Sequence, residues 1–247
     1  MKSIQIENHG HGNEVLHHDG AILDNVRIVI YGNGNRVLVE RSCLNNVVIE
    51  IHGNDNEYRF VEDCCVSNFR IQSQANNGPE RMADRTRLLI GRAVQISEGS
   101  ATLGADETCV EIHHATTIVK ANFFAVERAT KIVVGERCLF SWDIDLRTSD
   151  WHSVFNMETG ARINEPKSVV LGSRVWVGSD VRILKGVSIG EGSIIGVGSI
   201  VTKSVPANCA AAGNPARVIR RNVRWSHDSS VKTPQIEPNQ VTAILPT

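Results

Sequence analysis

The chain has 247 residues, of which 41% are hydrophobic, which is enough for one large domain or two smaller ones with a substantial core. Lysine and arginine number 26 against 27 aspartates and glutamates, and the resulting net charge of −1 gives no support to nucleic-acid or membrane-surface binding. Aromatic residues make up only 5%, so valine and isoleucine must fill most of the core, which favours strands.

The N-terminal residues, MKSIQIENHGHGNEV, lack the apolar stretch of a signal peptide. No run of about 18 apolar residues predicts a membrane span. The six cysteines form no CxxC pair, and we interpret them as reduced, buried side chains. These features predict a cytoplasmic protein. The histidines near the N-terminus have no accompanying cysteine or carboxylate pattern, and we predict no metal site.

A loose repeat occupies the N-terminal third of the chain. GHGNEVLH begins at Gly10, GNGNRVLV at Gly32 and GNDNEYRF at Gly53. Each has Gly-x-x-Asn followed by alternating residues, a pattern typical of a turn that enters a strand. We therefore predict an N-terminal β-repeat region over residues 1–85, with coils stacked in the same solenoid as the following segment or in an abutting one. The polar segment 72–87, which contains Gly-Pro, predicts a loop at this boundary.

A regular six-residue repeat runs from residue 171 to 206, as LGSRVW, VGSDVR, ILKGVS, IGEGSI, IGVGSI and VTKSVP. The first position of every hexad is aliphatic, and the fifth is small or β-branched. Glycine in the second place of four hexads permits a tight corner at little steric cost. Three hexads would make one triangular coil of about 18 residues, with coils stacked about 4.8 Å apart through parallel strands.

This periodicity resembles that of the hexapeptide-repeat acyltransferases, whose repeats form a left-handed parallel β-helix. We therefore predict an all-β fold, in which a left-handed parallel β-helix carries a looser N-terminal β-solenoid extension. The resemblance supplies the handedness, which departs from the usual right-handed crossover. We assign residues 86–221 to the acetyltransferase domain. Residues 222–247, polar and rich in proline, are expected to form an extended C-terminal tail.

The segment from about residue 132 to 221 is similar to galactoside, maltose and capsular-polysaccharide O-acetyltransferases. In that branch a histidine lies on a loop ahead of a Val-Trp-Ile-Gly repeat; here DWHSV precedes RVWVGSDV, and AAGNPARVIR completes the match. The resemblance implies that His152 is the general base, because a neutral imidazole with a pKa of about 6.5 can take a hydroxyl proton. It also implies that Trp176 lines the acyl pocket. Trp176 occupies an outward position and has no core to fill in its own chain. Packing between subunits is the other role open to Trp176.

Three carboxylates upstream of His152 are candidates for orienting its ring, as in other histidine-based acyl-transfer sites. Asp143 and Asp145 alternate with apolar residues, as on a strand, and we rank them ahead of Asp150. Solvated carboxylates at the edge of a coil are the alternative interpretation of each.

The resemblance also implies which residues bind acetyl-CoA, the acyl donor. Ser179 would contact the pantetheine arm, and amides near Gly178 and Ser179 would hold the thioester oxygen. Cations would pair with the phosphates of the nucleotide end. The complete set implied for the donor is Gly178, Ser179, Val197, Thr202, Lys203, Arg217 and Arg220.

The sequence thus predicts an acetyl-CoA-dependent O-acetyltransferase that acts on a sugar or polysaccharide, preferably a capsular or surface glycan. The expected mechanism is direct attack on the thioester with His152 as base. The resemblance implies a homotrimer with active sites between the prisms, and the long segment 151–168 would shape the acceptor mouth. Two alternatives stay open: an N-acetyltransferase for an amino sugar or other small acceptor, and a non-catalytic β-solenoid binding protein.

Overall fold

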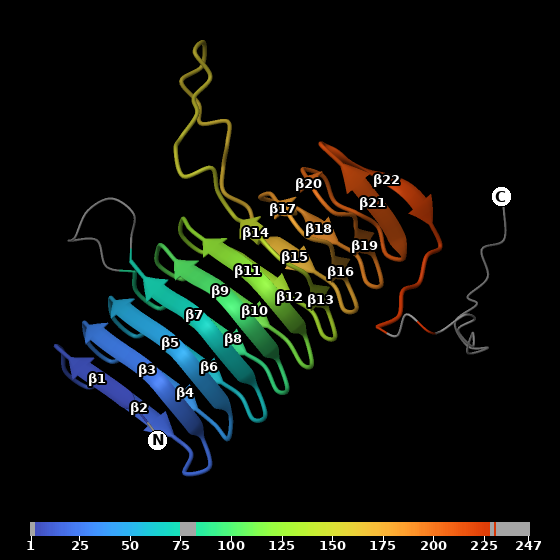
Figure 1. Ribbon diagram of the computed structural model, residues 1–247. Coiled ribbons are helices and arrows are strands. Elements are labelled where there is room, and N and C mark those ends of the chain that lie inside the picture. Colours follow the sequence, from blue (N-terminus) through green and yellow to red (C-terminus); the bar gives the residue numbers. More distant parts are fainter. Residues whose placement is uncertain (1–2, 75–82, 228–229, 231–247) are drawn as a thin grey trace.

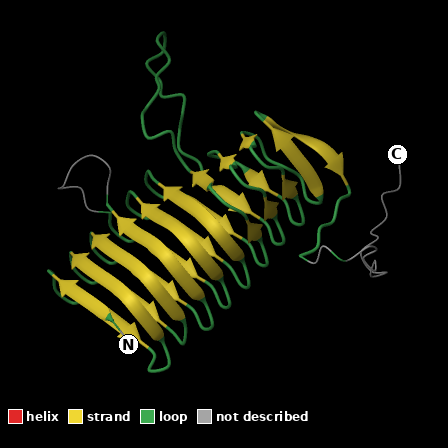
Figure 2. Cartoon of the chain, in the orientation of Figure 1, coloured by secondary structure: helices red, strands yellow, loops and turns green. Residues whose placement is uncertain are grey.

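The computed structural model describes residues 3–74, 83–227 and 230. Its regular elements are β-strands stacked along a single axis, from the N-terminal coil at one end to the C-terminal hairpin at the other (Figures 1 and 2). Nearly all strand pairs are parallel, so the chain forms the all-β solenoid that the sequence predicts. Within the described residues, no helix has the length and apolar character that a membrane crossing requires.

Each N-terminal coil contains one long and one short strand. The long strands share one sheet: β1 (Ile4–Asn8), β3 (Ile22–Tyr31), β5 (Cys43–His52), β7 (Cys65–Ser73), β9 (Gln95–Leu103) and β11 (Thr117–Ala125). The short strands share a second sheet: β2 (Glu14–His17), β4 (Arg36–Val39), β6 (Glu57–Phe60), β8 (Arg87–Ile90), β10 (Cys109–Ile112) and β12 (Lys131–Val134).

After β11 the next long strand is divided into two separate strands. β13 (Leu139–Phe140) pairs with the start of β11, and β14 (Ile144–Arg147) pairs with its end. Asp143, between them, has a φ of 56°, and Asn25, Asn46 and Asn68 take the same left-handed conformation within β3, β5 and β7, so the earlier coils turn at this corner as well.

The split creates three faces. The first face contains β13, β16 (Trp176–Val177), β19 (Ile194–Ile195) and β21 (Cys209–Gly213). The second face contains β14, β17 (Arg182–Ile183) and β20 (Ile200–Val201). β15 (Val169–Leu171) and β18 (Ser188–Ile189) extend the short-strand sheet, and β22 (Ala216–Arg221) folds back antiparallel on β21 to end the stack.

The hexad prediction is confirmed residue by residue. Trp176 lies opposite Ile194, and Arg182 lies opposite Ile200, so each triangular coil takes 18 residues. Every first and fifth position of the six hexads is at most 4% exposed: Leu171, Val175, Val177, Val181, Ile183, Val187, Ile189, Ser193, Ile195, Ser199, Val201 and Val205. The ladders of aliphatic side chains therefore form the core of the prism.

The Gly-x-x-Asn repeats are also explained by stacking. A β-carbon on Gly10 would lie 1.7 Å from the carbonyl oxygen of Gly32 in the next coil, so only glycine fits there. The asparagines form an inward ladder, in which the Asn35 side-chain amide donates to Asn13 Oδ1 at 3.0 Å and Asn56 donates to Asn35 Oδ1 at 2.9 Å. These repeats therefore belong to the same solenoid as the hexads.

Strand pairing continues across the predicted boundary at residue 85. β7 pairs with β9, and β6 pairs with β8, on either side of the loop predicted there. Residues 75–82 of that loop lie outside the described residues. The architectural change therefore comes between residues 139 and 147 rather than at residue 85.

Candidate active site

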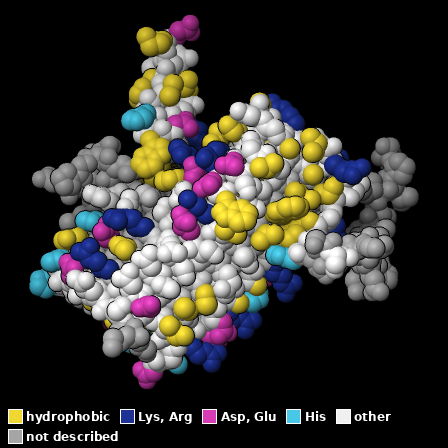
Figure 3. Space-filling view, in the orientation of Figure 1, with side chains coloured by type: hydrophobic (Ala, Val, Ile, Leu, Met, Phe, Trp, Pro, Cys, Tyr) yellow, Lys and Arg dark blue, Asp and Glu magenta, His cyan; other side chains and the backbone are white. Residues whose placement is uncertain are grey.

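Residues 148–168 form an arm that leaves the prism after β14 and projects away from it (Figure 1). Its outer part is a narrow hairpin, in which the Ile163 N–H donates to the Val154 oxygen at 2.9 Å and the Asn156 N–H donates to the Ala161 oxygen at 2.8 Å. Figure 3 shows hydrophobic side chains along this projection, and Met157 near its tip is 97% exposed.

Two ion pairs fix the base of the arm to the coils. Arg162 donates to both carboxylate oxygens of Glu127, at 2.7 and 2.8 Å. Hydrogen bonds from Arg162 and Ser149 hold the pKa of the Glu127 carboxyl below its usual value. Asp150 accepts from Lys185, and this bond lowers the pKa of Asp150 in the same way.

His152 lies just beyond this fixed base and is exposed. Its backbone oxygen accepts a 2.7 Å hydrogen bond from the Asn164 side chain, which also donates to Asp150 at 2.9 Å. Within the described residues, the His152 imidazole has no hydrogen-bond or ion-pair partner. The main chain at His152 is therefore anchored, while the ring is open to a ligand.

Asp143 and Asp145 are paired with other groups. Asp143 Oδ1 lies 3.2 Å from Lys120 Nζ. Asp145 is only 8% exposed, and its Oδ2 lies 3.0 Å from Arg147 Nη2 and 3.2 Å from Arg182 Nε. The predicted contact of either carboxylate with the imidazole of His152 is therefore absent from the single chain.

Trp176 points outward from β16 and is 37% exposed, as the sequence suggests. It is not buried in a core of its own chain, and the ring of Trp225 lies 6.1 Å from its ring between centroids. Trp225 is held there by its indole nitrogen, which donates to the Arg174 oxygen at 2.7 Å. Residues 222–227 of the expected tail thus lie against the prism, and residues 231–247 lie outside the described residues.

The two backbone amides proposed to bind the thioester oxygen differ in whether their N–H already donates a hydrogen bond. The Gly178 N–H donates to the Ile195 oxygen at 2.8 Å, so it is already used in the ladder. A β-carbon on Gly178 would also lie 2.9 Å from the nitrogen of Val197, which indicates a role in coil stacking. The Ser179 N–H has no hydrogen-bond acceptor among the described residues, so Ser179 is the better candidate.

The other predicted donor contacts all lie on the surface. Val197 is 71% exposed at the corner between the first and second faces. Lys203, Arg217 and Arg220 are exposed, and none of them forms an ion pair with a carboxylate that the structure describes. Thr202 is exposed as well, whereas Ser179 is half-buried.

His152 and Trp176 are not brought together in one chain. The arm leaves from the end of the second face, whereas Trp176 lies on the first face, and β14 and β17 stand between them (Figure 1). A site that uses both residues therefore needs the arm of one copy beside the first face of another.

The profile "Bacterial transferase hexapeptide (six repeats)" matches residues 168–203, which build the triangular coils described above. These residues are hexapeptide repeats of the bacterial transferase type. The solved structure of the polySia specific acetyltransferase NeuO superposes on this chain with a TM-score of 0.70 at 29% identity, covering 94% of this chain and 92% of that one. The polysialic acid O-acetyltransferase OatWY shares the fold, with a TM-score of 0.70 at 24% identity over 96% of this chain and 98% of that one. Both superpositions include the N-terminal coils.

Two curated sequences resemble this hexapeptide-repeat chain. The polysialic acid O-acetyltransferase of Escherichia coli O1:K1 / APEC is 49% identical over 110 residues, which are 44% of this chain and 36% of that protein. The polysialic acid O-acetyltransferase of Neisseria meningitidis is 33% identical over 75 residues, which are 30% of this chain and 34% of that protein. These sequence matches span about a third of each relative's length.

Proposed function

We propose that the protein transfers an acetyl group from acetyl-CoA to a hydroxyl of an acidic capsular or surface polysaccharide. The open imidazole of His152, on an arm fixed to the coils by two ion pairs, is the observation that carries this proposal. The names of the relatives, polysialic acid O-acetyltransferases, support a polymer of sialic acid as the acceptor.

In the proposed step, His152 takes the proton of the acceptor hydroxyl while the oxygen attacks the thioester carbonyl. The new ester C–O bond forms and the C–S bond breaks, and the imidazolium returns the proton to the departing thiolate. The Ser179 amide, which has no acceptor among the described residues, is suited to stabilise negative charge on the carbonyl oxygen. A positioned base typically contributes about 10²–10⁴-fold to such a reaction.

Acetyl-CoA fits the surface beside Trp176 on chemical grounds. The donor carries phosphates, and Lys203, Arg217 and Arg220 are exposed cations without ion pairs in the described part of the chain. Trp176 offers a flat apolar surface near the amide of Ser179.

We propose that the active unit is a homotrimer, in which His152 of one copy approaches Trp176 of the next. The separation of these residues within one chain supports a shared site. The exposed Trp151, Val154, Phe155, Met157 and Ile163 give the arm an apolar surface suited to such a contact.

The test is acetyl transfer by the wild-type protein from labelled acetyl-CoA to polysialic acid, to neutral polysaccharides and to amino sugars. Label in an alkali-labile ester on the acidic polymer is expected. Label in an alkali-stable amide would support the alternative N-acetyltransferase. Absence of both transfer and acetyl-CoA binding would leave only a non-catalytic binding protein.

A further inference from the structure

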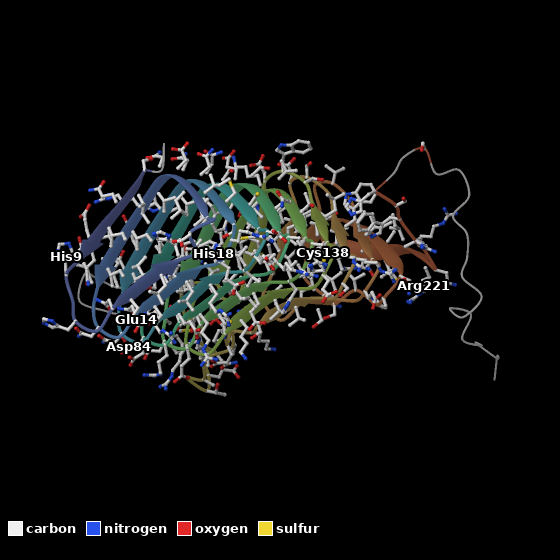
Figure 4. All side chains as sticks on the ribbon, turned by 90° about the horizontal axis from the view of Figure 1, so that it is seen from below. His9, Glu14, His18, Asp84, Cys138 and Arg221 are labelled. Carbon is white, nitrogen blue, oxygen red and sulfur yellow. The ribbon has the colours of Figure 1, made fainter. Side chains whose placement is uncertain are left out.

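A cavity of about 650 Å³ opens at the corner between the short-strand sheet and the first face. One wall consists of corner residues from successive coils: Arg137, Arg174, Gly192 and Asn208. The other wall is residues 222–227, which we call the C-terminal strap. Figure 4 labels Cys138, next to Arg137, and Arg221, the last residue before the strap.

The strap is held in place by contacts along its length. The Val223 N–H donates to the Asn208 oxygen at 2.9 Å, and the Trp225 indole donates to the Arg174 oxygen at 2.7 Å. The rings of Trp225 and His227 lie 4.8 Å apart between centroids. The cavity is therefore bounded by two surfaces that hydrogen bonds join.

The lining is cationic and aromatic. Among the described residues, the cavity is lined by three arginines and a histidine, and by no aspartate or glutamate. Arg174 forms an ion pair with Glu191, in which Nη2 lies 2.7 Å from Oε1. Arg137 forms no ion pair with any carboxylate in the described ranges. A guanidinium pairs well with a carboxylate, and the ring of Trp225 provides an apolar surface for the carbon skeleton of a sugar.

We propose that this cavity binds a carboxylate-bearing sugar unit of the acceptor polymer, away from the unit that is acetylated. The proposal rests on the proposed function for its acceptor class. Trp225 contacts both the cavity and Trp176, so a polymer held here would pass the predicted acyl pocket. The cavity would therefore give preference to polymers over single sugars.

The first test measures direct binding of short polysialic acid oligomers to the full chain without acetyl-CoA, and thus does not depend on turnover. Arg137→Gln is expected to weaken binding about tenfold, the scale of one charge-assisted hydrogen bond. Oligomers whose carboxyls are reduced to alcohols should bind wild type and Arg137→Gln equally weakly. Arg87→Gln is the matched control, because Arg87 is exposed on β8 without an ion pair in the described residues, and it should bind like wild type.

Equal affinity of wild type and Arg137→Gln for the acidic oligomers, or no binding by wild type, would overturn the proposal. A loss of acetyl-CoA affinity in Arg137→Gln, with oligomer affinity unchanged, would assign the cavity to the donor and overturn it as well. Oligomer binding that depends on Arg137 in a protein without transferase activity would support the cavity assignment while rejecting the proposed function.

A second variant tests the strap. Trp225→Ala is expected to raise KM for polysialic acid about tenfold, with a smaller effect on KM for a single sialic acid unit and on acetyl-CoA affinity. Equal changes in KM for polymer and single unit would contradict a separate subsite.

Discussion

Lys185, just after β17, donates a hydrogen bond to Asp150, and this contact ties the arm that carries His152 to the second face of the prism. Together with the Arg162–Glu127 pair, it gives the arm a fixed base and a free tip. The position of the imidazole therefore depends on groups that do not take part in the proposed chemistry.

Lys185→Met should loosen the base of the arm. Asp150 is about half exposed, so water screens its ion pair with Lys185. Loss of the pair should therefore raise the equilibrium constant for opening of the arm by up to about fivefold. Hydrogen exchange of a peptide covering residues 153–164 measures this opening. Unchanged protection would show that the Arg162–Glu127 pair alone holds the arm.

Protonation of the Glu127 carboxylate at low pH should release the arm. Its pKa is lowered in the folded protein, chiefly by the hydrogen bond from Arg162, so its stabilisation is present above the unfolded pKa and is lost as the pH falls through the folded value. Arm protection in wild type should therefore exceed that of Glu127→Gln near neutrality. The two should converge only when the pH falls below the folded pKa of Glu127, which lies under the ordinary glutamate value of about 4.3. A difference that persists in acid would contradict this assignment.

Phe140 supports the coil in which the long strand splits. It is fully buried, and Phe140→Ala should lower the free energy of unfolding by about 3–5 kcal/mol. Leu16→Ala is the control, because Leu16 on β2 is 53% exposed and should change stability by less than about 0.5 kcal/mol. Urea unfolding of both variants checks the contrast, and similar midpoints would be inconsistent with the split-strand core.

Asp143→Asn and Asp145→Asn test the role of the upstream carboxylates. Because these groups contact Lys120, Arg147 and Arg182, neither substitution should move the limb of the pH dependence of kcat/KM that reports His152. A shift of that limb by about one pKa unit would show that one of them reaches the imidazole in the assembled protein.

The sequence predicted those parts of the fold that depend on local periodicity. The hexads place Val177 and Ile195 in the core because every sixth residue takes the equivalent inward position on the next face of the coil. Periodicity does not reveal where a long strand breaks, because the same left-handed conformation lies inside β3 at Asn25 and between β13 and β14 at Asp143.

Long-range contacts of the candidate site were harder to predict. Trp225 reaches Arg174 across 51 residues, and a single tryptophan in a polar tail was the one available signal. The partners of Asp145 likewise come from neighbouring strands whose register is set only in the folded coil. The prediction of His152 rests on its place ahead of a motif and not on contacts within the chain.

The most direct measurement is the rate of acetyl transfer to polysialic acid by His152→Ala, with His11→Ala as a control on an exposed loop of the first coil. The proposed base predicts that kcat falls by about 10²–10⁴-fold in His152→Ala while acetyl-CoA affinity and the His11→Ala rate stay at wild-type values. Transfer by His152→Ala at close to the wild-type rate would contradict the account.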